Sequence, residues 1–330
     1  MLFGFEVEET AMKIFHLACA GLMLVLPAQV PAQDYPTKPV RFIVPLAAGG
    51  GMDTVSRGLA QKLGESLGQA IIVDNRGGGG GSIGAEMAAA AAPDGYTMIM
   101  MSATAIIHPL MYKARYDLFR NFIPVSQVTA QPYVLTVHPS LPMKSVRELV
   151  AYAKANPAKL NYASAGQGSL IHLASELFNS TAGIKTVHVP YKGIGAAYPD
   201  LIAGHVQMVF ASIVSVQPHV RAQRLRALAV SSAQRAKAQP DWPTVAEAGI
   251  PGFAVTQWYG VFVPARTPRA VVERLNREII KAVHEPDLTG RFAADGAEAV
   301  GSSRQEFAAH LKAEHDKWSK VIRDTGIKGD

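Results

Sequence analysis

Cysteine is almost absent from this chain of 330 residues, which carries a single one, Cys19. One thiol cannot form an internal disulfide, so the class of small secreted domains held together by disulfides is excluded. Charged residues make up only 18% of the chain, while glycine and proline occur without a period, so disordered and collagen-like classes are excluded too. The hydrophobic fraction of 48% indicates a globular protein, and the length favours two domains.

Long apolar runs are also scarce, and the one that stands out lies at the N-terminus. Met12-Lys13 precedes an apolar run of about a dozen residues, 14–26, and Val30-Pro31-Ala32 follows it. This order is typical of a signal peptide cleaved after Ala32, with residues 1–11 as a misassigned upstream start. A membrane anchor is the alternative, but the run is shorter than the ~20 residues that span a bilayer. Lipid attachment at Cys19 is a second alternative, although the residues before it match a lipobox poorly.

The mature chain, residues 33–330, is therefore expected in the periplasm without a thiol. Removal of one Lys and three Glu raises the formal net charge from +6 to +8. A positive field favours an anionic partner, whether a metabolite, a phospholipid or a nucleic acid. No dense run of Lys and Arg occurs, so nucleic acid is the least favoured of these three.

Catalytic and metal-binding motifs are missing as well. The sequence has no HExxH, CxxC or GxSxG pattern, so we expect no metal and no cofactor. Ser169 and His172 invite a hydrolase interpretation, but three residues apart on one helix they share a face and cannot set up an in-line attack. Ser169 is better interpreted as a helix N-cap. For His172 a structural role and a ligand contact remain equally open.

What the sequence does contain is an alternation of short β-branched runs and helical stretches, typical of parallel sheets flanked by helices. Two extended segments, 133–138 and 258–263, bracket the second set of such units. We therefore expect an α/β fold of two lobes joined by two crossing strands. Residues 33–135 with 257–330 would form lobe I, and 136–256 lobe II. Two sequential independent domains are the alternative.

Glycine-rich corners follow strands and open helices at three places, residues 45–53, 75–84 and 163–169. The unpaired N–H groups of a helix start attract anions, and small residues let an anion approach the backbone. A tight turn that needs glycine is the alternative for any one corner. The first and third corners lack the GxGxxG spacing of a dinucleotide site. We expect the first and third corners to face each other across a cleft and the second to shape its rim.

Hydroxyl side chains follow another buried strand. Ser102 and Thr104 come directly after the apolar run 96–101, at the carboxyl end of the strand, where open α/β sheets bind ligands. A simple helix cap is the alternative for these hydroxyls.

Taken together, these residues resemble the solute receptors of tripartite tricarboxylate transporters, often called Bug receptors, over nearly the whole mature chain. The resemblance is carried by segments in both lobes and in the C-terminal part: Tyr35-Pro36, Pro45 with Gly49-Gly50 and Asp53, Asn75-Arg76, Pro93-Asp94-Gly95-Tyr96-Thr97, Tyr162-Ala163-Ser164, His172-Leu173, Val189-Pro190-Tyr191-Lys192-Gly193, Pro243-Thr244-Val245, Trp258, Gly260 and Thr267-Pro268.

The resemblance implies a periplasmic Venus-flytrap binding protein of type II-like architecture that binds a carboxylate through backbone amides and ordered waters and delivers it to a two-component permease. The implied ligand-binding residues are Ala48, Gly49, Ser102, Thr104, Ser164, Gly166, Gly168, Ser169, Gly195 and Ala196. Ala211 departs from the family pattern, because an Asp is frequent there, and this favours a plain mono-, di- or tricarboxylic acid over an amino acid. We thus expect a monomeric receptor and not an enzyme. An exported enzyme that acts on a small carboxylate is the alternative.

Overall fold

The structure is a computed structural model that describes residues 35–46, 48–294 and 296–328. The expected signal peptide, its cleavage site and Cys19 lie outside the described residues. The described residues from Pro36 onward form one compact unit.

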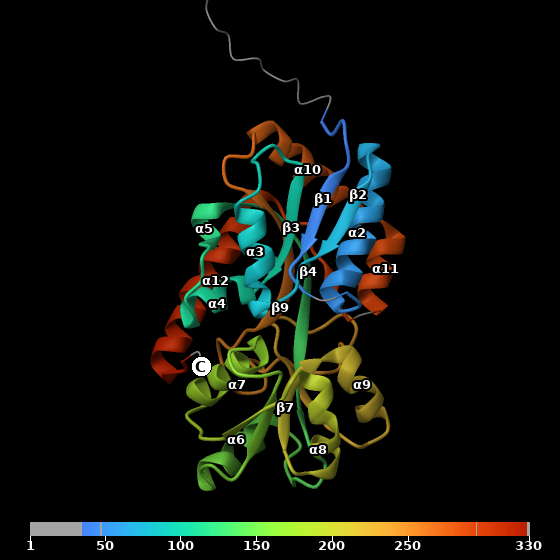
Figure 1. Cartoon of the computed structure of the whole chain (residues 1–330). Coiled ribbons are helices and arrows are strands. Elements are labelled where there is room, and N and C mark those ends of the chain that lie inside the picture. Colours follow the sequence, from blue (N-terminus) through green and yellow to red (C-terminus); the bar gives the residue numbers. More distant parts are fainter. Residues whose placement is uncertain (1–34, 47, 295, 329–330) are drawn as a thin grey trace, which may run out of the picture. The chain divides into compact units, whose positions relative to one another are not determined.

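Strands and helices alternate through most of this unit (Figure 1). In chain order the strands are β1 (Val40–Val44), β2 (Ile71–Asn75), β3 (Thr97–Ser102), β4 (Phe122–Val137), β5 (Asn161–Ser164), β6 (Val187–Pro190), β7 (Met208–Ser212), β8 (Arg226–Val230), β9 (Thr256–Pro264) and β10 (Glu298–Ala299). The helices are α2 (Gly51–Leu67), α3 (Ser82–Ala89), α4 (Thr104–Met111), α5 (Leu118–Asn121), α6 (Val146–Ala155), α7 (Leu170–Ala182), α8 (Tyr198–Ala203), α9 (Ile213–Arg221), α10 (Arg269–Val283), α11 (Pro286–Ala294) and α12 (Arg304–Thr325), with short 3-10 helices η1 (Gly79–Gly81) and η2 (Ile194–Ala197).

The strands make two β-sheets that share β4. In the first, β2, β1 and β3 are parallel, and β9 joins β3 to β4 in antiparallel pairing. In the second, β6, β5 and β7 are parallel, and β7 and β8 pair with β4 in antiparallel fashion. The expected α/β architecture of two lobes joined by crossing strands is confirmed.

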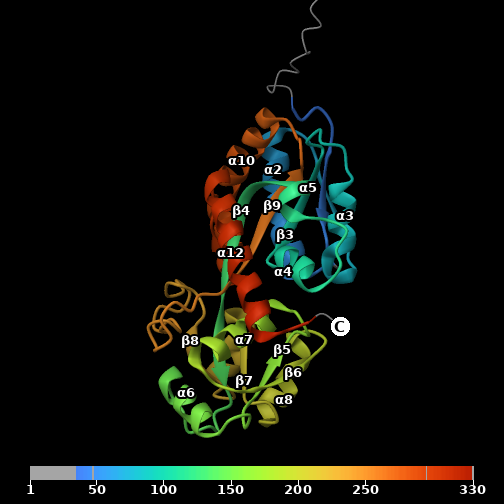
Figure 2. The same cartoon turned by 90° about the vertical axis from the view of Figure 1, so that its left-hand side faces the viewer.

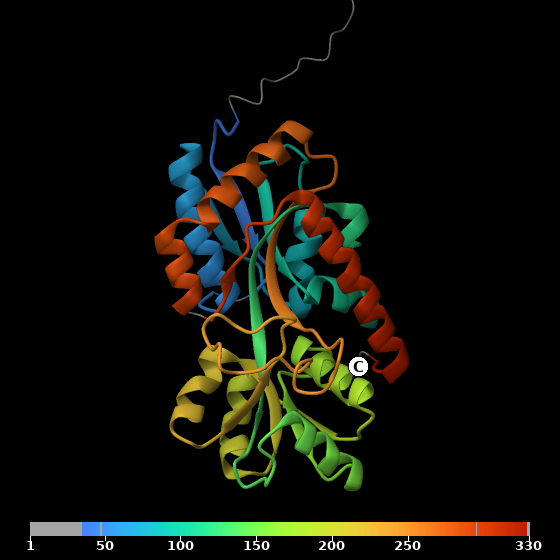
Figure 3. The ribbon, with the colours of Figure 1, turned by 180° about the vertical axis from the view of Figure 1, so that it is seen from behind.

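The long strand β4 passes from one sheet into the other (Figure 3). Its first part, from Phe122 to Pro132, pairs with β9, and its last part, from Tyr133 to Val137, pairs with β7. Only the segment 133–138 was expected to be extended. Pro124, Pro132 and the polar residues between them hide the strand signal, and the pairing with β9 is irregular there. Proline lacks the N–H that a strand donates, so it is found at bulges and edges.

The two crossing segments are locked together by Ser231, which is fully buried. Its hydroxyl accepts a hydrogen bond from the Tyr133 N–H at 2.8 Å and donates one to the Val255 carbonyl at 2.5 Å. Its backbone N–H donates to the Tyr133 carbonyl at 2.7 Å. The end of β8 thus holds the junction of the lobes on both sides.

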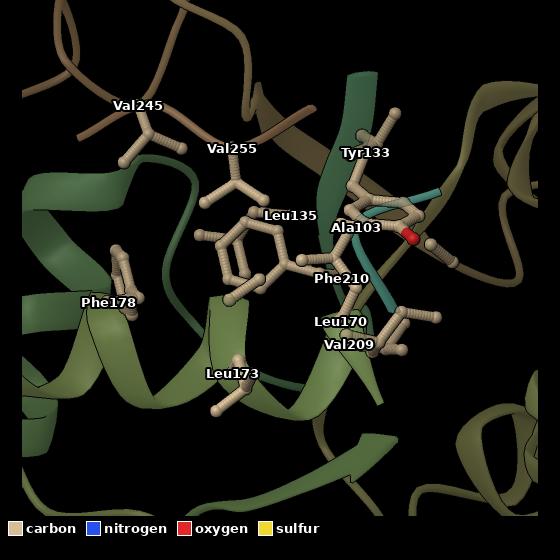
Figure 4. Close-up of a cluster of buried hydrophobic side chains, with 14 of the residues drawn as sticks. Ala103, Tyr133, Leu135, Leu170, Leu173, Phe178, Val209, Phe210, Val245 and Val255 are labelled. Carbon is tan, nitrogen blue, oxygen red and sulfur yellow. The ribbon is translucent and has the colours of Figure 1, made fainter. Parts of the chain in front are cut away.

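Buried apolar side chains fill the space between sheets and helices. Phe178 of α7 packs edge-on against Phe210 of β7, with ring centroids 5.8 Å apart, and Leu135 of β4 lies in the same cluster (Figure 4). Ala103, on the turn after β3, also reaches this cluster, near Tyr133 and Leu170 (Figure 4). The core therefore continues from one lobe into the other.

Helix α12 begins beside the first sheet and ends beside α7 of the second (Figure 2). At its start a capping box joins Ser303 and Glu306, which satisfies two otherwise unpaired N–H groups. Near its end, the Gln167 side chain donates a hydrogen bond to the Lys328 carbonyl at 3.3 Å. The C-terminal helix thus contacts both lobes.

Candidate functional site

The residues expected to bind the ligand lie at the carboxyl ends of strands in both sheets. Ala48 and Gly49 follow β1, and Ser102 and Thr104 follow or end β3. Ser164 ends β5, and Gly166, Gly168 and Ser169 lead from it into α7. Gly195 and Ala196 belong to η2, after β6. The two sheets therefore each contribute a group of these residues at the same edge that the sequence indicated.

A small pocket, with a cavity volume of about 30 Å³, lies at this edge of the first lobe. Its lining residues are Pro45, Leu46, Met52, Gly80, Gly81, Ala85, Met101, Ser102, Thr104, Ala105 and Tyr116. None of them is charged, and the Tyr116 hydroxyl donates to the Ala105 carbonyl at 3.3 Å. The hydroxyls of Ser102 and Thr104 are therefore the ones in this pocket that can form hydrogen bonds with a ligand. The second glycine-rich corner, expected only to shape the rim, contributes Gly80 and Gly81 to this wall.

Asp53 occupies the first corner from inside the protein. Its buried carboxylate accepts hydrogen bonds from the Gly49 N–H at 2.9 Å, the Arg57 guanidinium at 2.9 Å and the Asn75 amide at 3.0 Å. Burial acts to raise the pKa of Asp53, but these three hydrogen bonds outweigh it and hold the pKa below its ordinary value. The Gly49 N–H, expected to grip a ligand, is thus already paired.

The free donors of the first corner lie two or three residues further along. Gly51 and Met52 open α2, and no backbone acceptor among the described residues pairs with their N–H groups. The first N–H groups of a helix point outward along its axis and carry a partial positive charge. Helix α2 has 17 residues, so this end can attract an anion without a cationic side chain.

In the second lobe, Ser164 holds its own corner in place. Its fully buried hydroxyl lies 3.1 Å from both the N–H and the carbonyl of Gly166, and 2.6 Å from Nε2 of His188. A serine bonded to a histidine can form a nucleophile–base pair. Here the hydroxyl has no exposed surface through which a substrate could reach it, so this contact stabilises the turn.

His172 secures the same turn from the other side. Its Nδ1 accepts a hydrogen bond from the Gly168 N–H at 3.1 Å, and its ring stacks on His188 with centroids 3.9 Å apart. Burial, followed by the neighbouring His188, lowers the pKa of His172 to about 4. The imidazole is therefore neutral at pH 7, and its role is to orient Gly168.

Ser169 is the N-cap of α7, as expected, because its hydroxyl accepts a hydrogen bond from the His172 N–H at 3.2 Å. The N–H groups of Leu170 and Ile171, in the first turn, have no backbone acceptor among the described residues. These two amides, rather than those of Gly166 and Gly168, are the free donors of this corner. At η2, Gly195 and Ala196 are exposed, and the Ala196 N–H donates to the Gly193 carbonyl at 3.2 Å.

The glycine-rich corner of lobe II, residues 163–169, lies close to the end of α4 in lobe I. A Cβ atom added to Gly168 would lie 3.0 Å from the sulfur of Met111 and 3.6 Å from the Tyr112 hydroxyl. Gly168 also has a φ of +70°, which side chains disfavour. Both the positive φ of Gly168 and the close approach of Met111 from lobe I therefore disfavour a side chain at this position.

Several of these contributors were not indicated by the sequence. Helix α4 was missed, because its apolar run contains Pro109, and His188 lies far along the chain from its stacking partner. Asp53 was noted only as part of a motif. Its position four residues after Gly49 is a local signal that could have predicted the carboxylate–amide contact.

Ala211, where an Asp was expected in related proteins, is fully buried and pairs with Val134 of β4. At this position the chain presents a methyl group in place of a carboxylate. Within residues 35–46, 48–294 and 296–328, no helix is long and apolar enough to span a bilayer, and no group of three His, Cys, Asp or Glu could hold a metal ion.

Comparison with known proteins gives matches over most of the chain. A family model described as the tripartite tricarboxylate transporter family receptor matches residues 55–327. BugT of Bordetella pertussis is 36% identical over 318 residues, which cover 94% of this chain and 98% of BugT. The structure resembles Rhodopseudomonas palustris Rpa4515 with adipate, with a TM-score of 0.76, 35% identity, and coverage of 89% of this chain and 99% of that one. It also resembles R. palustris MatC with bound malate, with a TM-score of 0.71, 32% identity, and coverage of 87% and 100%.

Proposed function

Because the chain belongs to the tripartite tricarboxylate transporter receptor family, a family of periplasmic solute-binding proteins, we propose that it captures a small organic acid in a cleft between its lobes and presents it to a membrane permease. The observation that carries this proposal is that, in both lobes, a glycine-rich turn without charged ligand-facing groups leads from a strand end into a helix whose first backbone amides are free. The relatives with adipate and malate support a carboxylate as the recognised group.

Recognition rests on neutral donors. Ser102 and Thr104 supply hydroxyls, the starts of α2 and α7 supply amides, and Gly195 and Ala196 close the site from η2. The remaining proposed residues, Ala48, Gly49, Ser164, Gly166, Gly168 and Ser169, shape the two corners. Each hydrogen bond to a charged group contributes about 1.5–3 kcal/mol, so a few of them reach the roughly 8 kcal/mol of micromolar binding.

Lobe I comprises residues 33–135 and 257–330, and lobe II comprises 136–256. Closure on the ligand would be a hinge motion at the crossing strands, where small backbone changes move one lobe against the other. The mature chain acts as a monomer in the periplasm, reached through the signal peptide of residues 1–32. Size-exclusion chromatography with light scattering tests the monomer, and N-terminal sequencing of the exported protein tests cleavage after Ala32.

A thermal-shift screen of residues 33–330 with adipate, malate and citrate tests the binding proposal. A ligand at 100 times its dissociation constant stabilises the folded state by about 2.7 kcal/mol, which raises the melting temperature measurably. Calorimetry then ranks the acids that respond. If no carboxylate shifts the melting temperature, the proposal is wrong.

The alternative, an enzyme that acts on a carboxylate, predicts a changed ligand. We propose binding without chemistry, because Ser164, the hydroxyl that pairs with a histidine, is fully buried. Mass spectrometry after prolonged incubation distinguishes the two: a receptor returns adipate or malate unaltered, whereas an enzyme yields a product.

A further inference from the structure

Tyr259 brings a phenol hydroxyl to the start of α2. A Cβ atom built on Gly51, the first residue of α2, would lie 3.4 Å from the Tyr259 hydroxyl oxygen. The hydroxyl is therefore next to the helix end whose first N–H groups are free. Tyr259 itself belongs to β9, one of the strands that join the lobes.

Strand pairing places the same side chain beside Ser102. In the antiparallel pair of β3 and β9, Ser102 lies directly opposite Tyr259. Opposite residues project to the same face of a sheet, with their Cβ atoms about 4.5–5.5 Å apart. Trp258, the preceding residue, projects to the other face, where its indole N–H donates to Glu314 of α12. The strand register thus brings the side chains of Ser102 and Tyr259 to one side of the sheet.

The Tyr259 hydroxyl is available as a donor. Burial raises its pKa, so the phenol keeps its proton at neutral pH. The Gln257 side chain forms a hydrogen bond with this hydroxyl that acts to lower its pKa, so the amide N–H of Gln257 is the donor. Since Oε1 of Gln257 has no hydrogen-bond partner among the described residues, the phenol O–H does not donate to it and is left for a ligand. The residue is half-buried, and a donor that is partly removed from water favours a partner supplied by a ligand.

We propose that Tyr259 is a ligand-binding residue, whose hydroxyl donates a hydrogen bond to the bound carboxylate alongside Ser102 and the first amides of α2. This inference rests on the proposed carboxylate-binding function and adds to it a contact from a crossing strand. A ligand held in this way touches the lobe corner and the joining strand at the same time.

Two variants test the contact from its two sides. Tyr259→Phe removes only the hydroxyl, and Gly51→Ala puts a methyl group into the space between that hydroxyl and the helix start. Gly51 has no positive φ and its added Cβ makes only ordinary contact, so the alanine fits the fold. Tyr152→Phe, on α6 of lobe II, is the matched control.

Calorimetry with adipate and malate provides the readout, and unliganded melting temperature reports on folding. Tyr259→Phe and Gly51→Ala are expected to weaken binding about 10- to 100-fold at unchanged or higher melting temperature, whereas Tyr152→Phe binds like the wild type. Wild-type affinity in both variants would overturn the role of Tyr259 and leave the receptor function intact. A wild-type protein that binds neither these two acids nor citrate would overturn both.

Discussion

The hydroxyl of Ser231 accepts the backbone N–H of Tyr133 at 2.8 Å, so a single side chain fastens β8 to the point where β4 passes between the lobes. The same hydroxyl donates to Val255, which precedes the other crossing strand. Since Ser231 is fully buried, water cannot replace either partner.

Ser231→Ala should therefore lower the free energy of unfolding by about 1–3 kcal/mol, because it leaves a buried N–H and a buried carbonyl without this partner. Urea denaturation followed by circular dichroism measures the change. Ser180→Ala, at an exposed position of α7, is the control and should stay within ±0.5 kcal/mol of the wild type. Equal losses in both variants would contradict the bridging role.

Gly260 is expected to tolerate no side chain. A Cβ atom there would lie 2.2 Å from the ring of Phe307, which α12 packs against the crossing strand β9. Gly260→Ala should destabilise the protein by about 1–3 kcal/mol through overpacking. In Gly290→Ala, on α11, nothing lies within 4 Å of the new methyl group, and the better helix propensity of alanine should raise stability by up to about 1 kcal/mol. Thermal unfolding of the two variants checks whether the melting temperature falls in Gly260→Ala and rises in Gly290→Ala.

His172 should make stability depend on pH. The unfolded chain binds a proton near the ordinary pKa of 6.5, whereas the folded chain resists it down to about pH 4. Unfolding free energy therefore falls as pH drops from 6.5 to 4, by at most about 1.4 kcal/mol per pH unit for this group, and the loss levels off below pH 4.

Denaturant titrations at several pH values compare wild type with His172→Gln, which cannot titrate and should show a flatter slope between pH 6.5 and 4. His205→Gln removes a histidine whose side chain is 74% exposed and serves as the control. Parallel curves for wild type and His172→Gln would show that His172 does not contribute to this dependence.

The hydroxyls of Ser102 and Thr104 should matter for binding more than for folding. The double variant Ser102→Ala/Thr104→Val is expected to weaken adipate binding at least about tenfold, since each lost hydrogen bond to a charged group costs 1.5 kcal/mol or more. Ser180→Ala/Thr181→Val makes the same changes at exposed positions of α7. Isothermal titration of the two double variants decides whether the pocket beside Ser102 holds the carboxylate.

The parallel units could be predicted from the sequence, because buried β-branched runs and amphipathic helices leave strong periodic signals. The helix 269–283 was expected at the bounds observed, and the strand predicted at 186–190 begins one residue later, at Val187. The expected family and fold are both confirmed. The first part of β4 could not be predicted, since Pro124 and its polar neighbours carry no strand pattern and are held there by β9.

At the corners, the sequence indicated which turns matter but not which amides are free. The Gly49 N–H is taken by Asp53, and the Gly168 N–H by His172, because side chains four residues away fold back onto the turns. Tyr259 was overlooked between Trp258 and Gly260, since its position depends on β9 lying beside β3. Contacts between strands that are far apart in the sequence cannot be predicted from the spacing of neighbouring residues.

Strand β4, finally, couples the two sheets through register. Side chains along a strand alternate between faces, so a slip of one residue turns every one of them to the opposite side. Here a slip of the 16-residue strand in one sheet has to be taken up by a bulge before it reaches the other, because Val134 and Leu135 pair with β7 and β8 along the same backbone that pairs Phe122 with Pro264. A pairing error of β4 in one sheet would therefore disturb its pairing in the other sheet, so each sheet restricts the strand register of its neighbour.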